Sequence, residues 1–397
     1  MNYNLRTAAL IAAGIVSAGS VARAEEASKN PVETALTSTT ISGYVSTSAF
    51  FDLGEDDGGS MSRLPGRSFD GADKLDKINL DVVKLTIEKP LDEGDWSAGY
   101  KVDLLFGPDA NTLGTSSVLG ENNSDFGVKQ AYVTLQTPVG NDLIAKVGVF
   151  DTIVGYEVFE SGNNPNYSRS YAYFIEPTQH TGLLLSYQIA EGISLSGGIA
   201  NSWNARINAP GAEAGVDRDF GLQTYLGSLA LTAPDSWGAL KGATLYAGVV
   251  HGLGSAEIGD ADPRTSLYAG LTIPTPLTGL GVGVAADYRT VETTDTNTDY
   301  AAAFAGYLTY QLSEQLKLGV RGEYAQGSNG TWGAPGPDGE ELFGVTATID
   351  YGLWANVLTR IEFRWDKDLS DGAGGFGTAL SPEENSYVLG LNLLYKF

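Results

Sequence analysis

The C-terminal stretch Asn385–Phe397, NSYVLGLNLLYKF, decides the fold class. Apolar side chains stand at every second position, in the order Tyr387, Leu389, Leu391, Leu393, Tyr395 and Phe397. A period of two is the pattern of a β-strand whose two faces meet different surroundings. The alternation runs without interruption to the last residue, so we predict a long strand at the very end of the chain.

The same alternation returns along most of the chain, in segments of ten to fourteen residues. In the segment 356–368, Ile361 and Phe363 share one face, and Arg360, Glu362 and Arg364 share the other. Strands of soluble proteins usually have about five or six residues, whereas a tilted strand needs about nine to eleven to cross a bilayer. Length and mid-strand charge together favour a membrane barrel over a soluble sandwich.

We predict sixteen strands, near residues 39–54, 78–90, 95–107, 126–139, 143–155, 179–190, 193–204, 219–233, 240–253, 264–275, 280–292, 299–312, 315–327, 341–353, 356–368 and 386–397. Short connections alternate with longer ones rich in Gly, Asp, Asn and Pro. This is typical of an all-β, antiparallel transmembrane barrel with short periplasmic turns and long extracellular loops. The pattern is weaker over 254–298, which leaves the count open by two strands.

The N-terminus reads as an export signal. Arg6 precedes an apolar stretch from Ala8 to Val21, and Ala22-Arg23-Ala24 offers a small-x-small cleavage site. The alternative is an anchor helix, but the stretch is short and rich in Ala and Gly. We therefore expect a signal peptide over 1–24, a short periplasmic lead over 25–38 and the barrel over 39–397.

Composition excludes several functions. The chain has no Cys, hence no disulfide framework or thiolate metal site, and its net charge of −24 disfavours a nucleic-acid partner. The acidic clusters 55–57, 338–341 and 383–384 fall in expected loops, where they raise the cation concentration or hold divalent ions that bridge to lipopolysaccharide. None has EF-hand spacing, so we expect no metal site and no cofactor.

A sixteen-stranded barrel encloses a lumen too wide for side chains to fill, and water occupies it. Only closure satisfies every backbone hydrogen bond in lipid, and the polar strand faces then line the lumen. The terminal Phe397 is similar to the aromatic residue that barrel-assembly machinery recognises in outer-membrane proteins. We therefore place the chain in the outer membrane of a Gram-negative-type bacterium, in contact with lipid and lipopolysaccharide. The leading hypothesis is a passive channel for small hydrophilic solutes or ions; the alternative is a loop-plugged structural or surface-binding barrel.

Several stretches of the first half resemble the family of β-barrel porins described as OmpL-like. The resemblance covers about residues 40–250 and is carried by 91–93, 102–110, 147–152, 155–157, 163–170, 176–177 and 180–182. It implies a porin-like fold and location and carries over no catalytic residue. Similarity to sixteen-stranded porins also implies a homotrimer.

In such porins the third extracellular loop folds inward, and the third long loop here is Tyr156–Thr178. We expect a constriction loop in which Glu157 and Glu160 supply negative charge beside Arg169. The alternative is a rigid surface loop packed by Tyr167, Tyr171 and Tyr173.

Charged residues on the predicted lumen faces could set ion selectivity as a ring or pair locally as structural networks. The predicted pore-lining set is Lys84, Lys101, Asp103, Lys146, Asp287, Arg289, Arg321, Glu323, Arg360, Glu362 and Arg364, with Asp366 as a further local partner. The only two histidines, His180 and His251, lie in no catalytic motif, so we expect both to be structural and the protein to have no enzymatic activity.

Overall fold

The protein is described here from a computed structural model. The structure describes residues 38–54, 63–115, 125–211, 224–255, 260–292, 298–328, 330–332, 340–370, 375–378 and 381–397. The expected signal peptide, nearly all of the expected lead segment and the acidic cluster 55–57 lie outside these residues, as do Asp338 and Gly339 of the second cluster.

Sixteen antiparallel strands form one closed barrel, and each strand pairs with its neighbours in the chain. They are β1 Thr40–Asp52, β2 Lys77–Lys89, β3 Ser97–Phe106, β4 Phe126–Thr137, β5 Leu143–Asp151, β6 Gln179–Ala190, β7 Ile193–Ala200, β8 Thr224–Thr232, β9 Thr244–Ser255, β10 Asp260–Pro274, β11 Leu280–Glu292, β12 Thr298–Gln311, β13 Leu316–Gly327, β14 Glu340–Trp354, β15 Val357–Asp368 and β18 Asn385–Lys396. A separate two-stranded hairpin, β16 Phe376–Gly377 with β17 Pro382–Glu383, lies in the last long loop.

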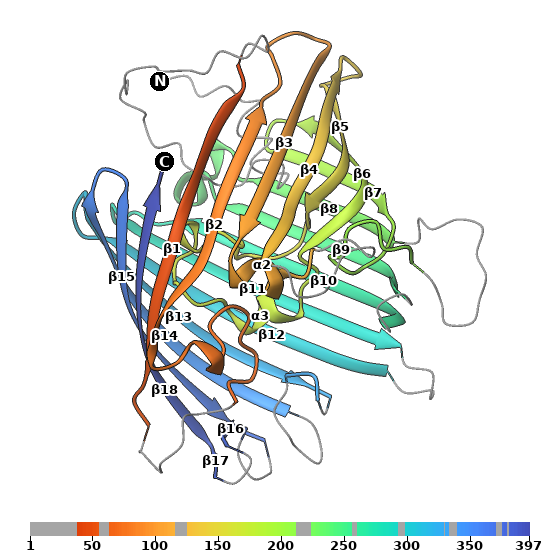
Figure 1. The fold of residues 1–397 in the computed structure, drawn as a ribbon. Helices are drawn as coiled ribbons and strands as arrows, with labels where there is room; N and C mark the ends of the chain where they lie inside the picture. The colour runs from red at the N-terminus through yellow and green to blue at the C-terminus, as the bar shows by residue number, and fades with distance from the viewer. Residues whose placement is uncertain are drawn as a thin grey trace.

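The first and last strands close the ring. Tyr44 lies opposite Lys396, and Asp52 lies opposite Val388. Beyond that register, Gly43 and Phe397 exchange backbone hydrogen bonds of 2.9 and 3.0 Å. The start of β1 and the C-terminus therefore share one end of the barrel (Figure 1).

The predicted count of sixteen strands is confirmed, including the two in the weakly patterned region, β10 and β11. Three predicted strands extend four residues too far within the described part of the chain. The fifth ends at Asp151 instead of 155 because the chain leaves the wall and turns into the lumen, with Gly155 at φ +106°. The seventh ends at Ala200 instead of 204, and the backbone N–H of Trp203 donates to the Leu253 carbonyl of β9. The ninth begins at Thr244 instead of 240, because residues 235–240 form a short helix in the turn before it.

The two strand faces differ as predicted. On β15, Ile361 and Phe363 are 50% and 41% exposed on the outer surface, whereas Arg360, Glu362 and Arg364 are buried inside. On β18, Leu391, Leu393 and Tyr395 face outward, and Leu394 and Asn392 between them are buried. The outer surface is thus the apolar, lipid-facing one.

Short helices lie within the ring of strands: η1 Ala72–Lys74, α2 Pro108–Leu113, η2 Ser161–Asn163 and α3 Tyr171–Ile175 (Figure 1). A fifth, η3 Asp235–Leu240, lies in the turn between β8 and β9. Among the described residues, no helix combines the length and apolar character needed to cross a bilayer.

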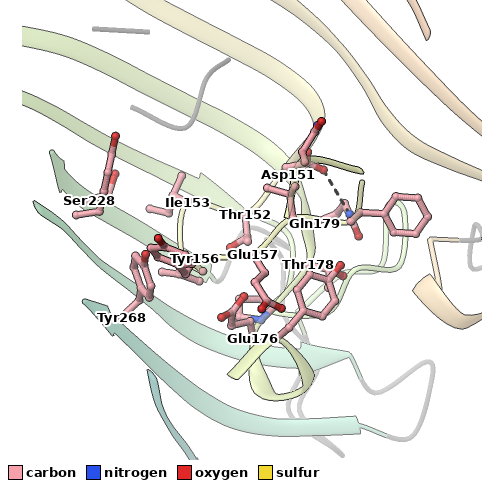
Figure 2. Close-up of a pocket in the computed structure, with 18 of the residues that line it drawn as sticks. Asp151, Thr152, Ile153, Tyr156, Glu157, Glu176, Thr178, Gln179, Ser228 and Tyr268 are labelled. Atoms are coloured by element: carbon pink, nitrogen blue, oxygen red, sulfur yellow. Dashed lines mark hydrogen bonds between the residues drawn. The ribbon is translucent and has the colours of Figure 1, made fainter. Parts of the chain in front are cut away.

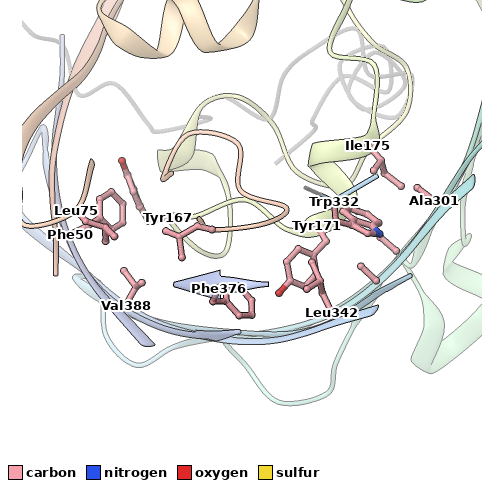
Figure 3. Packing of buried hydrophobic residues seen from close by; sticks show 14 residues of the cluster. Phe50, Leu75, Tyr167, Tyr171, Ile175, Ala301, Trp332, Leu342, Phe376 and Val388 are labelled. Carbon is pink, nitrogen blue, oxygen red and sulfur yellow. The ribbon is translucent and has the colours of Figure 1, made fainter. Parts of the chain in front are cut away.

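The largest apolar cluster is inside the barrel, between the inner wall and these inserted segments (Figure 3). Phe50 and Val388 contribute to it from the wall, and Tyr167, Tyr171 and Ile175 contribute from the third long loop. The core of this protein is therefore built on loops that enter the lumen.

The cost of placing a charge on the outer face should depend on its depth in the bilayer. Ile361→Arg places a charge near the middle of β15 and should cost about 2–4 kcal/mol of folding free energy in lipid vesicles, whereas Leu353→Arg near a strand end should cost about 0–1 kcal/mol. Denaturant unfolding followed by Trp fluorescence measures both. Equal losses at the two positions would contradict the assigned outer face.

Candidate functional site

The chain between β5 and β6, residues 152–178, forms the centre of the site and is called the inward loop below. It crosses to the far wall, where Val154 packs in a cluster with Leu226 and Val250, and the ring of Tyr156 stacks on Tyr307 at 4.3 Å. Gly155 makes the turn possible. A Cβ there would lie 2.2 Å from Oε2 of Glu176, so only glycine fits.

Arg321 of β13 fixes the middle of the inward loop. Its guanidinium is fully buried and pairs with Glu157 of the loop at 3.0 Å and with Glu323 of its own strand at 2.9 Å. It also donates to the carbonyl oxygens of Ser168 at 2.7 Å and Arg169 at 3.1 Å. Five planar donors suit one side chain to such a set of acceptors.

Side chains of β15 bond to the backbone of the inward loop as well. Arg360 donates to the carbonyl oxygens of Ser161 at 2.5 Å and Asn164 at 2.9 Å and pairs with Asp350 at 2.8 Å. Glu362 accepts from the backbone N–H groups of Tyr167 and Ser168, at 2.6 and 3.0 Å. The alternating charges of this strand thus bond to loop backbone.

Further along β15, Arg364 donates to the Arg169 carbonyl at 2.7 Å and pairs with Asp366 at 2.9 Å. Asp366 also accepts from the Tyr171 hydroxyl at 2.5 Å and pairs with Arg67 at 2.6 Å. Arg67 belongs to the first long loop, so that loop reaches the same point inside the barrel.

Two lysines, on β2 and β4, anchor Glu160 of the inward loop. This residue pairs closely with Lys84 of β2 and, at 3.4 Å, with Lys129 of β4. Burial raises the pKa of Glu160, but Lys129 and Lys84 together outweigh burial and hold the pKa below its usual range. Lys84 also pairs with Asp103 at 3.1 Å.

The three residues expected to charge a constriction are therefore buried and paired. Glu157 and Glu160 have their charges balanced by Arg321 and the lysines. Arg169 donates to the backbone carbonyls of Val158, Tyr167 and Phe159 within the loop, and its guanidinium lies 5.1 Å from the Phe69 ring. Tyr167, Tyr171 and Tyr173 of the same loop are also buried inside the barrel, so the loop packs into the lumen and not on the outer surface.

The other predicted pore-lining residues differ in their partners. Lys101 lies 3.3 Å from Glu88, and Lys146 stands over the Tyr132 ring at 4.4 Å. Asp287 and Arg289 follow each other at alternate positions of β11, but no ion pair joins them in the described part of the chain; Asp287 instead bonds to Glu176 of the inward loop. Within the predicted set, ion pairs join Lys84 with Asp103, Arg321 with Glu323, and Arg364 with both Glu323 and its further partner Asp366.

A cavity of about 400 Å³ remains beside the inward loop (Figure 2). One side is loop, with Tyr156, Glu157 and Glu176; the other is wall, with Tyr268 of β10 and Ser228 of β8. Lys101, Lys129, Gln130 and Asp151 reach it from the strands that precede the loop. It is lined by charged groups, hydroxyls and tyrosine rings together.

Sequence reasoning missed two charged residues that hold inserted segments, Asp81 and Lys129. Asp81 pairs with Lys74 at 3.0 Å and accepts from the Tyr167 hydroxyl at 2.9 Å, and Lys129 pairs with Asp151 at 2.5 Å. Each is the extra residue at a β-bulge, where the register shifts and two successive side chains are buried. A break in the alternation is the only sequence signal.

The histidines are placed as structural residues. His180 is fully buried, 3.2 Å from the Thr152 hydroxyl, and His251 is exposed, 2.8 Å from the Thr265 hydroxyl. In the described part of the chain, no three His, Asp or Glu side chains are arranged to hold a metal ion.

Known structures share this architecture. The anion-selective porin from Comamonas acidovorans matches with a TM-score of 0.58 at 11% identity, over 91% of this chain and 99% of that one. The outer membrane channel DcaP of Acinetobacter baumannii matches with a TM-score of 0.57 at 12% identity, over 90% and 97%. OmpT of Vibrio cholerae in its trimer form matches with a TM-score of 0.55 at 13% identity, over 91% and 99%.

No curated protein matches the sequence. The family model described as "Putative beta-barrel porin-2, OmpL-like" matches residues 38–397, which include every strand of the barrel. The chain therefore belongs to this OmpL-like porin family and is a porin of the Gram-negative outer membrane.

Proposed function

We propose that the protein is a passive diffusion channel for small hydrophilic solutes and ions, narrowed by the inward loop. The observation that carries this proposal is the loop's position, bonded to the inner wall of β13 and β15 and flanked by a cavity of about 400 Å³ whose lining includes charged groups and hydroxyls. Water and solutes pass a wall of fixed charges and hydroxyls, with no cofactor and no covalent step. The predicted pore-lining residues act in this proposal mainly by holding the loop.

A fixed loop explains why the lumen could stay open. Arg321 of β13 and Arg360 and Arg364 of β15, on either side of β14, bond to loop carbonyls and fix this part of the loop to the wall. A buried ion pair contributes little net stability when compared with apolar packing, but removing one partner costs about 3–5 kcal/mol. The arginines therefore specify one loop position rather than add stability.

A loop-plugged barrel without conductance is the second candidate. Val154 packs against β8 and β9, and Tyr156 stacks on Tyr307 of β12. The first long loop enters too, where Lys74 pairs with Asp109 of α2 at 2.6 Å. These contacts obstruct part of the lumen. Such a protein would serve as a structural or surface-binding barrel.

The proposed partners are the barrel-assembly machinery, the lipid and lipopolysaccharide of the membrane, and further copies of the chain. The outward Phe397, 50% exposed beside Gly43, is available to barrel-assembly machinery, and the outer face meets lipid and lipopolysaccharide. A homotrimer is proposed from the likeness to OmpT of Vibrio cholerae in its trimer form. Residues 1–24 direct export, and 25–38 form a short periplasmic lead.

Conductance separates the two candidate functions. Folded protein inserted into a planar bilayer in KCl should give discrete current steps, because a water-filled path carries ions. Protein that inserts, as shown by protease protection in the same lipid, but never raises current above the bare membrane would support the plugged barrel and end the channel proposal.

Loosening the loop should widen the path. Arg321→Gln leaves Glu157 buried without its cation, a loss of about 3–5 kcal/mol that loop release would relieve, whereas Glu323 keeps Arg364 at 3.3 Å. We expect larger and noisier single-channel steps than in wild type. Lys241→Gln, which removes a cation from an exposed periplasmic turn, is the matched control and should leave the steps unchanged. Unaltered steps in both variants would show that the loop does not limit conductance.

A further inference from the structure

Two carboxyl groups meet inside the barrel without a base. Glu176 ends α3 of the inward loop, Asp287 stands on β11, and their side chains are hydrogen-bonded to each other. The residues are 9% and 5% exposed. Two ionised carboxylates have only acceptor oxygens, so this bond requires a shared proton.

This pair differs from the other buried acids of the loop site. Glu157, Glu160 and Asp366 each have an arginine or lysine partner. Among the described residues, neither Glu176 nor Asp287 forms an ion pair, and Oδ2 of Asp287 is buried with no hydrogen-bond partner. The nearest further charge is the Glu157 carboxylate, which repels both. In the part of the chain that the structure describes, no cationic side chain uses the acceptor capacity of the pair.

The pair stands at the polar cavity beside the inward loop. Glu176 lines that cavity, and Asp287 lies directly across the β10–β11 register from Tyr268, which lines it as well. Tyr156 and Tyr246 complete this end, and Figure 2 shows Tyr156 and Tyr268 on one side of Glu157 and Glu176. Aromatic rings beside carboxylates attract organic cations.

We propose that Glu176 and Asp287 form a binding subsite for the ammonium group of a permeating organic amine. An ammonium group has three N–H donors and can bond to both carboxylates in place of the shared proton. The tyrosine rings provide contact for its alkyl chain. This inference rests on the proposed channel function and names a class of solute for it. Among the described residues no three acidic or histidine side chains are arranged to hold a metal ion, so the geometry fits an amine better.

Proton and amine compete for the pair. Burial, Asp287 and Glu157 raise the pKa of Glu176, so the proton leaves this pair at a higher pH than it leaves an ordinary carboxyl group. Amine binding should therefore strengthen with rising pH and weaken with falling pH. The charged and titratable groups around the pair, on the loop and on β9, β10, β12 and β13, are Tyr156, Glu157, Tyr246, Tyr268, Tyr307, Arg321 and Glu323.

The test uses n-butylammonium chloride added to a planar bilayer that carries KCl current through the protein. Wild type should show concentration-dependent current block, and butyrate of the same chain length should not block. The double variant Glu176→Gln/Asp287→Asn removes both carboxyl charges with little change of shape and should weaken the block about tenfold or more. The control is Asp235→Asn, which removes an exposed acid from a periplasmic turn. Its KCl current should be blocked by n-butylammonium as strongly as that of wild type.

Several results would overturn the subsite while leaving the channel intact: normal KCl current with no amine block, equal block in the double variant, or block in wild type that does not weaken at acid pH. The wild-type pH series decides the question even where the double variant does not fold. A protein without KCl current would instead fail the channel proposal. Calorimetric titration of the folded barrel with n-butylammonium then tests the subsite alone, and absence of heat above that with butyrate would refute it.

Discussion

A backbone in lipid has no water to bond to, and this constraint shapes the whole protein. Each strand must pair along both edges, which only a closed ring allows. The pairing of β1 with β18 supplies that closure, and Phe397 extends it to the last residue through Gly43. Because a ring of sixteen strands is wide, closure also creates an interior that the wall residues alone do not fill.

The interior is filled in part by loop backbone, and the wall supplies the charges that this backbone needs. Arg321, Arg360 and Arg364 donate to loop carbonyls, while Glu362 accepts from loop N–H groups. The period-two alternation that keeps β15 apolar outside therefore determines where the inward loop lies inside. One strand pattern thus connects membrane insertion, loop position and the shape of the remaining cavity.

Strand number, strand faces and the lumen position of most charged residues could be predicted because they follow from local alternation. Asp81 and Lys129 could not, since each sits at a bulge where the alternation breaks. The partners of Arg360 and Asp287 could not be predicted from the sequence either. Asp350 and Glu176 contact them through strand register and loop folding, which join residues distant in the chain and leave no spacing signal.

The central claim is that the inward loop is held against β14 and its neighbours, where Asn166 donates to the Thr348 hydroxyl at 2.7 Å. Because the chain has no cysteine, the double variant Asn166→Cys/Thr348→Cys contains a single possible disulfide. Mild oxidation of the folded barrel should link the two thiols, as read by mass spectrometry after alkylation. The pair Asn166→Cys/Ser186→Cys, with its second cysteine on β6 at the opposite side of the ring, should stay reduced. Free thiols in both variants would contradict the account.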